Sequence, residues 1–324
     1  MYSRRNRLNY DVRMRRKRII LAFTALVVIG GLIAVIIPFS SKLQERSRVN
    51  SGVGMQRREI LRLWDNGSFE EAFRQSRTAL DLRPMDYFFL TMHGFSAYQL
   101  GISQVSNLDA ARYFDECRES LRRAMLLKEA AGDGRLYYVL GKAYSYKGES
   151  FADLSVKYLE KAVELSYNAA DIPEYLGMAY AMIGDYRSSV AAFSDALNPQ
   201  VQEETGSAQS GLLLLSIAGS YLGLNENESA RAYLLRCIEV TPDSNVLLQA
   251  KLLLAQALEN TGDINGAIRQ LSEVLEESGD IAEVHYRIGE MYVKQGDTAR
   301  ARASWRQAVR ADPAHAKARM RLTM

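Results

Sequence analysis

The residues best suited to chemistry are few in this chain, and they are far apart. The 324 residues include three histidines, His93, His285 and His315, and two cysteines, Cys117 and Cys237. No two of the histidines have the spacing of zinc ligands, and there is no Cys-x-x-Cys pair. Phosphate-binding, nucleophile-elbow and dinucleotide motifs are also missing. We therefore expect no metal, no cofactor and no enzymatic activity, with both cysteines buried as small packing residues.

One segment near the N-terminus is apolar enough to span a membrane. Residues 19–39 form a run of 21 residues without a charge. As a helix this run spans roughly 31 Å, the thickness of a bilayer's hydrocarbon core. Residues 1–18 carry eight basic side chains and one acidic one, so the positive-inside rule keeps them in the cytoplasm and exports the remainder. The sequence predicts a basic tail (1–18), a transmembrane signal anchor (19–39) and a polar tether (40–52) in an inner-membrane protein with a periplasmic body.

Other export signals fit this segment less well. A cleavable signal peptide has a shorter apolar core and a small-x-small cleavage site, which does not follow here. Residues 3–5 (SRR) resemble the start of a twin-arginine signal, but Arg7 and Asn9 interrupt the pattern. Reversed topology would export the basic tail. Gly30 and Ala34 form a small-xxx-small pair on which two anchors could pack, so a homo-oligomer stays open.

Charge argues against a nucleic-acid partner. The chain has 41 Lys+Arg and 38 Asp+Glu, but without residues 1–18 the balance is 33 against 37. The basic excess thus belongs to the tail, and the exported body has a net charge of −4. A body of this charge lacks the basic surface that nucleic-acid binding requires, so we expect other proteins or peptides as partners.

The body repeats with a period of about 34 residues. Gly262, Ala267 and Leu271 are matched, 34 positions later, by Gly296, Ala301 and Trp305. The same spacing, followed backwards, gives units that start near 53, 87, 134, 170, 211, 248 and 282. A period of this length is typical of stacked helix pairs that share one core. About eleven extra residues fall around 102–110, and about two fall in 149–153.

The last unit carries a recognisable pattern. It reads Ile288-Gly289, Tyr292, Gly296, Ala301, Trp305, Ala308 and Pro313. This pattern resembles the tetratricopeptide repeat (TPR). The resemblance implies an all-α solenoid of about seven helix pairs over 53–315, with 316–324 as a C-terminal cap. Glycines are expected at the turns between paired helices, where they supply a positive φ: Gly67, Gly101, Gly148, Gly184, Gly262 and Gly296.

The resemblance also implies a binding surface, because in TPR proteins the first helices of the units line a concave groove. Carried over to this chain, the N-terminal groove positions are aromatic and rich in methionine: Trp64, Phe88, Phe95, Tyr98, Tyr138, Lys142, Tyr146, Met178 and Met182. The C-terminal positions are more polar: Leu215, Gln256, Glu259, Tyr286, Glu290 and Lys294. Aromatic anchors suit an apolar helix or an extended peptide. Alternatively, several of them pack on the insertion after Gly101 or on the tether.

Together these features predict a membrane-anchored scaffold or assembly protein of an envelope complex. The layout is similar to that of cytochrome c maturation factors, companions of outer-membrane protein insertion and the periplasmic collar of spirochaete flagellar motors. The alternative function is a periplasmic chaperone or holdase that binds apolar peptides of many clients. Membrane-anchored cytosolic repeat proteins would share the layout with the opposite topology.

Overall fold

The computed structural model describes residues 52–198 and 210–323, and the regular elements within these ranges are all helices. The chain divides after Gln75 into two compact units. The predicted tail, anchor and most of the tether (1–51) lie outside the described residues. Inside the described ranges, no helix is long and apolar enough to cross a membrane.

In the described part of the first unit, one helical segment precedes the start of α2. Residues 52–65 are helical, Gly67 makes the turn at a φ of 73°, and α2 (Phe69–Leu82) begins two residues later and runs on into the second unit. The rings of Trp64 and Phe69 meet edge to face with centroids 5.0 Å apart. This contact closes the turn, since the two residues flank it on either side.

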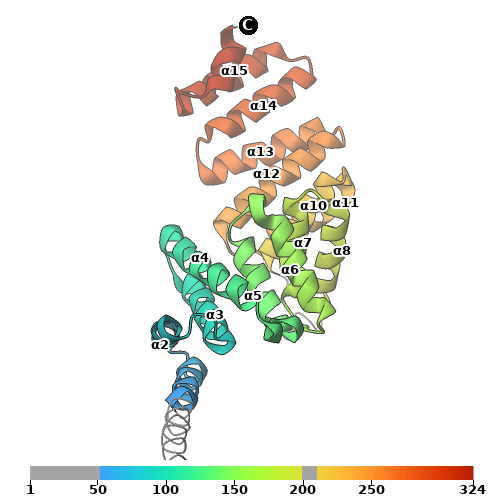
Figure 1. The fold of residues 1–324 in the computed structure, drawn as a ribbon. Helices are drawn as coiled ribbons and strands as arrows, with labels where there is room; N and C mark the ends of the chain where they lie inside the picture. Colours follow the sequence, from blue (N-terminus) through green and yellow to red (C-terminus); the bar gives the residue numbers. More distant parts are fainter. Residues whose placement is uncertain (1–51, 199–209, 324) are drawn as a thin grey trace, which may run out of the picture. The chain divides into compact units, whose positions relative to one another are not determined.

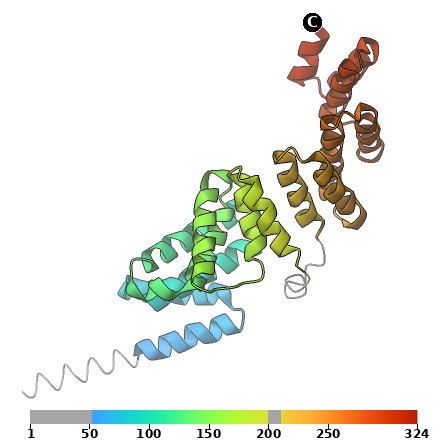
Figure 2. The same cartoon turned by 90° about the vertical axis from the view of Figure 1, so that its right-hand side faces the viewer.

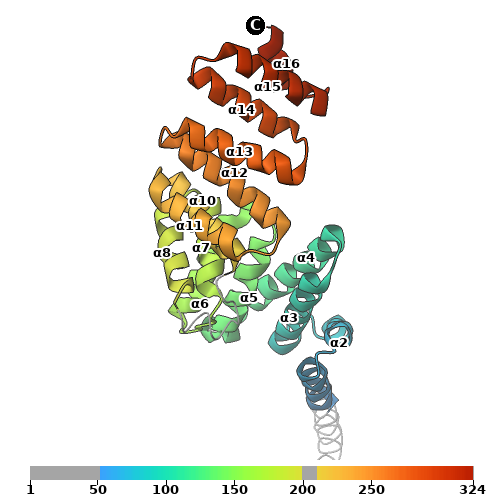
Figure 3. The same ribbon diagram turned by 180° about the vertical axis from the view of Figure 1, so that it is seen from behind.

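The second unit is a succession of helix pairs (Figure 1). In chain order these are α3 (Tyr87–Ser103), α4 (Asn107–Ala124), α5 (Gly134–Ser145), α6 (Ala152–Glu164), α7 (Ile172–Met182), α8 (Tyr186–Ala196), α10 (Gly211–Gly223), α11 (Asn227–Val240), α12 (Ser244–Asn260), α13 (Ile264–Ser278), α14 (Ala282–Lys294), α15 (Thr298–Ala311) and α16 (Ala316–Thr323). Short 3-10 turns cover Lys128–Gly132 and Glu149–Phe151. Each helix packs on the next one, as Figure 3 shows for α12 and α13. The all-α expectation is confirmed.

The turns inside the pairs follow from two adjacent residues. Gly184, Gly262 and Gly296 end their helices at φ values of 80°, 85° and 77°, a region that side chains with a Cβ avoid. An aspartate follows each glycine, and its carboxylate accepts a hydrogen bond from a backbone N–H in the first turn of the next helix. The Gly-Asp dipeptide therefore stops one helix and starts the next. In the unit from 211, Asn225 takes the left-handed position with a φ of 58°.

The expectation of a turn at Gly101 is wrong. Helix α3 continues to Ser103, and α4 begins at Asn107 after a connection of three residues. Gly101 lies inside α3 against the ring of Phe114, where an added Cβ would stand 2.7 Å from the ring. The extra residues of this unit lengthen both helices. A unit of 34 residues would turn at Gly101, but here the two helices continue and pack on each other through Gly101 and Phe114.

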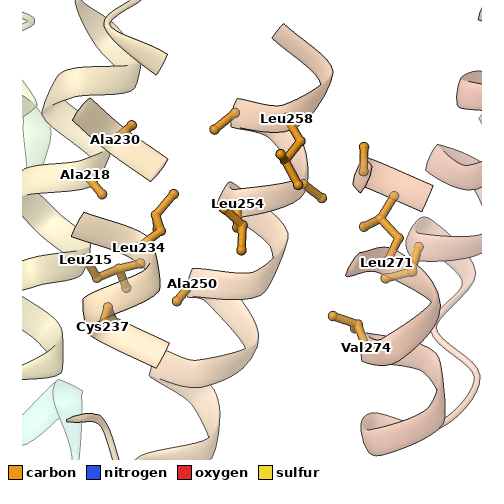
Figure 4. Close-up of a cluster of buried hydrophobic side chains, with 14 of the residues drawn as sticks. Leu215, Ala218, Ala230, Leu234, Cys237, Ala250, Leu254, Leu258, Leu271 and Val274 are labelled. Atoms are coloured by element: carbon orange, nitrogen blue, oxygen red, sulfur yellow. The ribbon is translucent and has the colours of Figure 1, made fainter. Parts of the chain in front are cut away.

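The core is built where a bulky side chain of each second helix enters a small position on the first. An added Cβ would lie 2.6 Å from Leu121 at Gly94, 2.7 Å from Leu159 at Gly141 and 2.5 Å from Phe193 at Gly177. In the units from 211 and 248, Ala218 and Ala255 take these glycine positions near Leu234 and Leu271, and Figure 4 shows Ala218, Leu234 and Leu271 in this core cluster. Helix α16 closes the C-terminal end by burying Ala318 against the Trp305 cluster beside α15 (Figure 2).

The two cysteines occupy such packing positions, as expected. Both Cys117 and Cys237 are fully buried and unpaired. Burial raises the pKa of both thiols above its ordinary value, because the thiolate is poorly solvated there. Neither thiol is therefore suited to nucleophilic chemistry at neutral pH.

The glycine positions predict opposite effects of the same substitution. Gly177→Ala forces the new methyl group into Phe193, which should cost about 1–3 kcal/mol of overpacking and outweigh the ~1 kcal/mol that alanine gains in a helix. Gly219→Ala on α10 meets nothing within 4 Å and should stabilise by about 0.5–1 kcal/mol. Urea unfolding of both variants measures the difference. Equal midpoints would contradict this account of the packing.

Candidate functional site

The first helices α3, α5 and α7 place a lysine among tyrosines. Lys142 of α5 is only 7% exposed. Its ammonium group donates hydrogen bonds to the Tyr138 hydroxyl at 2.9 Å and to Asp171 Oδ2 at 2.6 Å. The Tyr138 hydroxyl in turn donates to the Asp171 carboxylate at 2.9 and 3.0 Å. These three groups form a closed polar triangle that ties α5 to the residue preceding α7.

Aromatic rings surround the same ammonium. Lys142 Nζ lies 4.4 Å from the ring centroid of Tyr175, 4.8 Å from that of Tyr138 and 5.5 Å from that of Tyr98. All three distances are within the range of cation–π attraction, which grows as the cation loses its water. The rings come from α7, α5 and α3 respectively, so one side chain connects three successive first helices.

Tyr146 brings this cluster to the surface. Its ring stacks on Phe114 of α4 with centroids 4.4 Å apart and an angle of 10° between the planes. Its hydroxyl lies 3.3 Å from that of Tyr175. Tyr146 is 49% exposed, whereas its neighbours are mostly covered. A half-exposed aromatic ring on a rigid support is the type of residue that anchors a partner at low entropic cost.

The acid–base properties of the cluster suit binding better than proton transfer. Burial, with the neighbouring tyrosines or Asp171, raises the pKa of Tyr98, Tyr138 and Tyr175 well above its ordinary value. The hydroxyls therefore remain neutral at physiological pH, and Lys142 is held in an ion pair. The described residues also contain no group of three or more His, Cys, Asp or Glu placed to hold a metal.

Glu174 stands out beside this cluster. Burial raises the pKa of its carboxyl group, the charge of Asp171 raises it further, and Lys142 partly opposes the shift. Glu174 forms no hydrogen bond or ion pair with another described residue. By contrast, the two predicted groove carboxylates of the C-terminal units are paired: Glu259 with Lys294 and Glu290 with Arg321. An unpaired, half-buried carboxylate attracts a cationic ligand.

The predicted groove residues fall into two groups. Tyr98, Tyr138, Lys142 and Tyr146 meet in the cluster described above. The others have different neighbours: Trp64 contacts Phe69 in the first unit, Phe88 contacts Phe89, Phe95 lies under the Arg135 guanidinium, Met178 packs on the Phe193 cluster, and Met182 is exposed.

The sequence reasoning missed Asp171, Glu174 and Tyr175. A signal for two of them was present. Glu174 follows Tyr138 by 36 residues, the spacing between Gly141 and Gly177, so it takes the place of Tyr138 on the next first helix. Asp171 takes in the same way the place of Arg135, whose guanidinium lies over the predicted groove residue Phe95. The predicted groove positions of this unit are only Met178 and Met182.

The comparisons agree with this architecture. Residues 177–324 match the family model of a tetratricopeptide repeat-like domain. The C-terminal part of a TPR repeat-containing protein from Cytophaga hutchinsonii is similar in structure, with a TM-score of 0.57, 16% identity, and coverage of 83% of this chain and 100% of that one. The described fold is therefore a TPR-like solenoid, and such a fold indicates a protein–protein interaction scaffold.

Two further solved structures match with lower TM-scores. YrrB, described as a TPR protein with an unusual peptide-binding site, has a TM-score of 0.48 and 21% identity over 64% of this chain and 100% of its own. MamA from Desulfovibrio magneticus has a TM-score of 0.47 and 16% identity over 56% of this chain and 96% of its own. A comparison with curated proteins found no match.

The Lys142 cluster predicts a strong coupling between two helices. In a double-mutant cycle with Lys142→Met and Asp171→Ala, we expect a coupling energy of about 1–3 kcal/mol, because either single change leaves a charge in a poorly solvated site. The matched control is Lys161 with Glu164, at 2.8 Å on the surface of α6; this pair should show no measurable coupling. Urea unfolding measures both cycles, and equal coupling in the two would rule out the cluster as a link between helices.

Proposed function

We propose that this protein is a single-pass inner-membrane scaffold whose TPR-like solenoid binds another envelope protein in the periplasm. Residues 19–39 supply the anchor and the basic residues before them set the orientation. Both lie outside the described residues, so this part of the proposal rests on the sequence. Confinement to the membrane would raise the local concentration of the solenoid for membrane-bound partners. A flagellar-motor collar is one envelope machine with proteins of this layout.

The observation that carries the proposal is that Tyr146 and Glu174 both adjoin the Lys142 cluster. Tyr146 offers a half-exposed ring, and Glu174 offers a carboxylate without a partner among the described residues. Tyr146 is held by its stacking on Phe114 and by the nearby hydroxyl of Tyr175, and Glu174 directly precedes Tyr175 on α7. The two residues fit a protein segment with an apolar or aromatic side chain close to an arginine or a lysine, since the ring takes the first and the carboxylate the second.

The burial of two predicted aromatic anchors favours a scaffold over a holdase. Phe95 and Tyr98, two of the predicted aromatic anchors, are only 4% and 5% exposed. Unfolded clients are held by broad apolar surfaces, and these two buried rings do not contribute to one. Substituting these two residues would also disturb packing, so Tyr146 and Glu174 are the better positions for a test of binding.

Glu174→Gln should weaken partner binding without harming the fold. Cells would be cross-linked intact, the membranes solubilised, and the proteins that co-purify with wild type and variant quantified by mass spectrometry. We expect one or two stoichiometric partners with wild type and a several-fold loss with Glu174→Gln. The urea midpoint of the variant should not fall, because the change removes an unpaired carboxylate next to Asp171.

The control is Glu119→Gln, which neutralises an exposed carboxylate on the second helix α4. It should leave the partner yield unchanged. A scatter of many unfolded precursors with wild type would instead identify a chaperone. An equal loss of partner yield with both variants would show a general effect of charge. An undiminished yield with Glu174→Gln would show that the partner binds elsewhere on the solenoid.

The proposed topology makes a separate prediction. A reporter enzyme that folds only after export, fused after Met324, should be active, because the positive-inside rule exports everything after residue 39. The same reporter fused after Arg18 should be inactive. Activity in the second fusion alone would reverse the topology.

A further inference from the structure

The pair α3–α4 extends further than the pairs that follow it. Measured from the packing glycine, α3 runs nine residues past Gly94, whereas α5 runs four past Gly141. On the second helices, α4 begins fourteen residues before Leu121, whereas α8 begins seven before Phe193. At 1.5 Å per residue the extra length is about 7–10 Å, and all of it falls at the end where α3 connects to α4.

This extended end carries exposed aliphatic side chains. We call residues 102–108 the α3–α4 tip. Ile102 is 46% exposed, Leu108 is 82% exposed, and Val105 is fully exposed at 102%. No charged residue occurs between Tyr98 and Leu108. Single exposed apolar residues are common on protein surfaces. Three of them on one uncharged protrusion indicate that it contacts an apolar partner, either another protein or a membrane.

The composition of the tip distinguishes between possible partners. Protein interfaces concentrate their binding energy in Trp, Tyr and Arg, whereas Val and Leu are under-represented among such residues. The α3–α4 tip has only aliphatic side chains among serine, asparagine and glutamine. One turn further on, Arg112 lies over the ring of Tyr113 at 5.2 Å. Aromatic and basic residues next to an apolar segment are typical of the membrane–water interface.

We infer that the α3–α4 tip inserts Ile102, Val105 and Leu108 into the surface of the bilayer that carries the anchor. The inference rests on the anchor of the proposed function. The insertion is shallow, because Asp109 follows the tip directly and a carboxylate stays with the headgroups. Three aliphatic residues bind a membrane weakly on their own, but a chain already tethered there needs only a small additional free energy. The tip would then fix how the second unit lies on the membrane.

The test uses the full-length chain in nanodiscs of phosphatidylethanolamine and phosphatidylglycerol, with one chain per disc. Val105→Cys is labelled with an environment-sensitive fluorophore. The native thiols Cys117 and Cys237 are buried and react poorly. The matched control is Leu126→Cys, 78% exposed just beyond the other end of α4, about 27 Å away along an 18-residue helix.

We expect the label at position 105 to be blue-shifted, several-fold less accessible to iodide than the label at 126, and quenched by nitroxide-bearing lipid. Adding Ile102→Ser and Leu108→Ser to Val105→Cys should restore iodide access, without loss of helicity because both residues are exposed. Equal iodide access at 105 and 126 would overturn the inference and leave the anchor intact. If the label at position 105 is protected from iodide only in discs that hold two chains, the inference is wrong and the tip contacts a second copy of the chain. A chain that does not enter nanodiscs would overturn the anchor and the inference together.

Discussion

The structure depends on how closely the two helices of each pair can approach. At Gly94, Gly141 and Gly177 the first helix has no side chain, and a leucine or phenylalanine of the second helix fills the space. Because each pair is fixed in this way, its first helix has a defined position next to the first helix of the following pair. The succession of contacts from α3 to α5 and α7 follows from this spacing, and any functional surface on these helices inherits its rigidity.

The Lys142 cluster adds a polar link to this apolar framework. A lysine is seldom buried unless its charge is compensated, and here Asp171, the Tyr138 hydroxyl and three aromatic rings compensate it. The partners come from three helices, so the charge can only be satisfied when the pairs stack in the observed order. Glu174 forms no hydrogen bond or ion pair among the described residues, and the charge of Lys142 only partly offsets its burial. This contrast between a satisfied lysine and an unsatisfied glutamate next to it is the main reason to place partner binding here.

Sequence reasoning worked where one residue type determines a local conformation. The 34-residue period, the turn glycines such as Gly184 and Gly296, and the buried Cys117 and Cys237 could be predicted, because each reflects a steric requirement of one position. Gly101 was misassigned because a glycine that admits Phe114 and a glycine that makes a turn look the same in a sequence. The cluster could not be predicted in full, because the pairing of Lys142 with Asp171 depends on how two units stack. Whether Phe95 faces a partner or the interior depends on the same stacking.

If the first helices bind one defined partner, that partner contacts Tyr146. Site-specific photo-cross-linking in intact cells tests it most directly, with benzoylphenylalanine in place of Tyr146 or, as a control, of Leu235, an exposed residue on the second helix α11. The account predicts one cross-linked species of fixed mass from position 146 and none from position 235. A ladder of many species, or the same product from both positions, would contradict it.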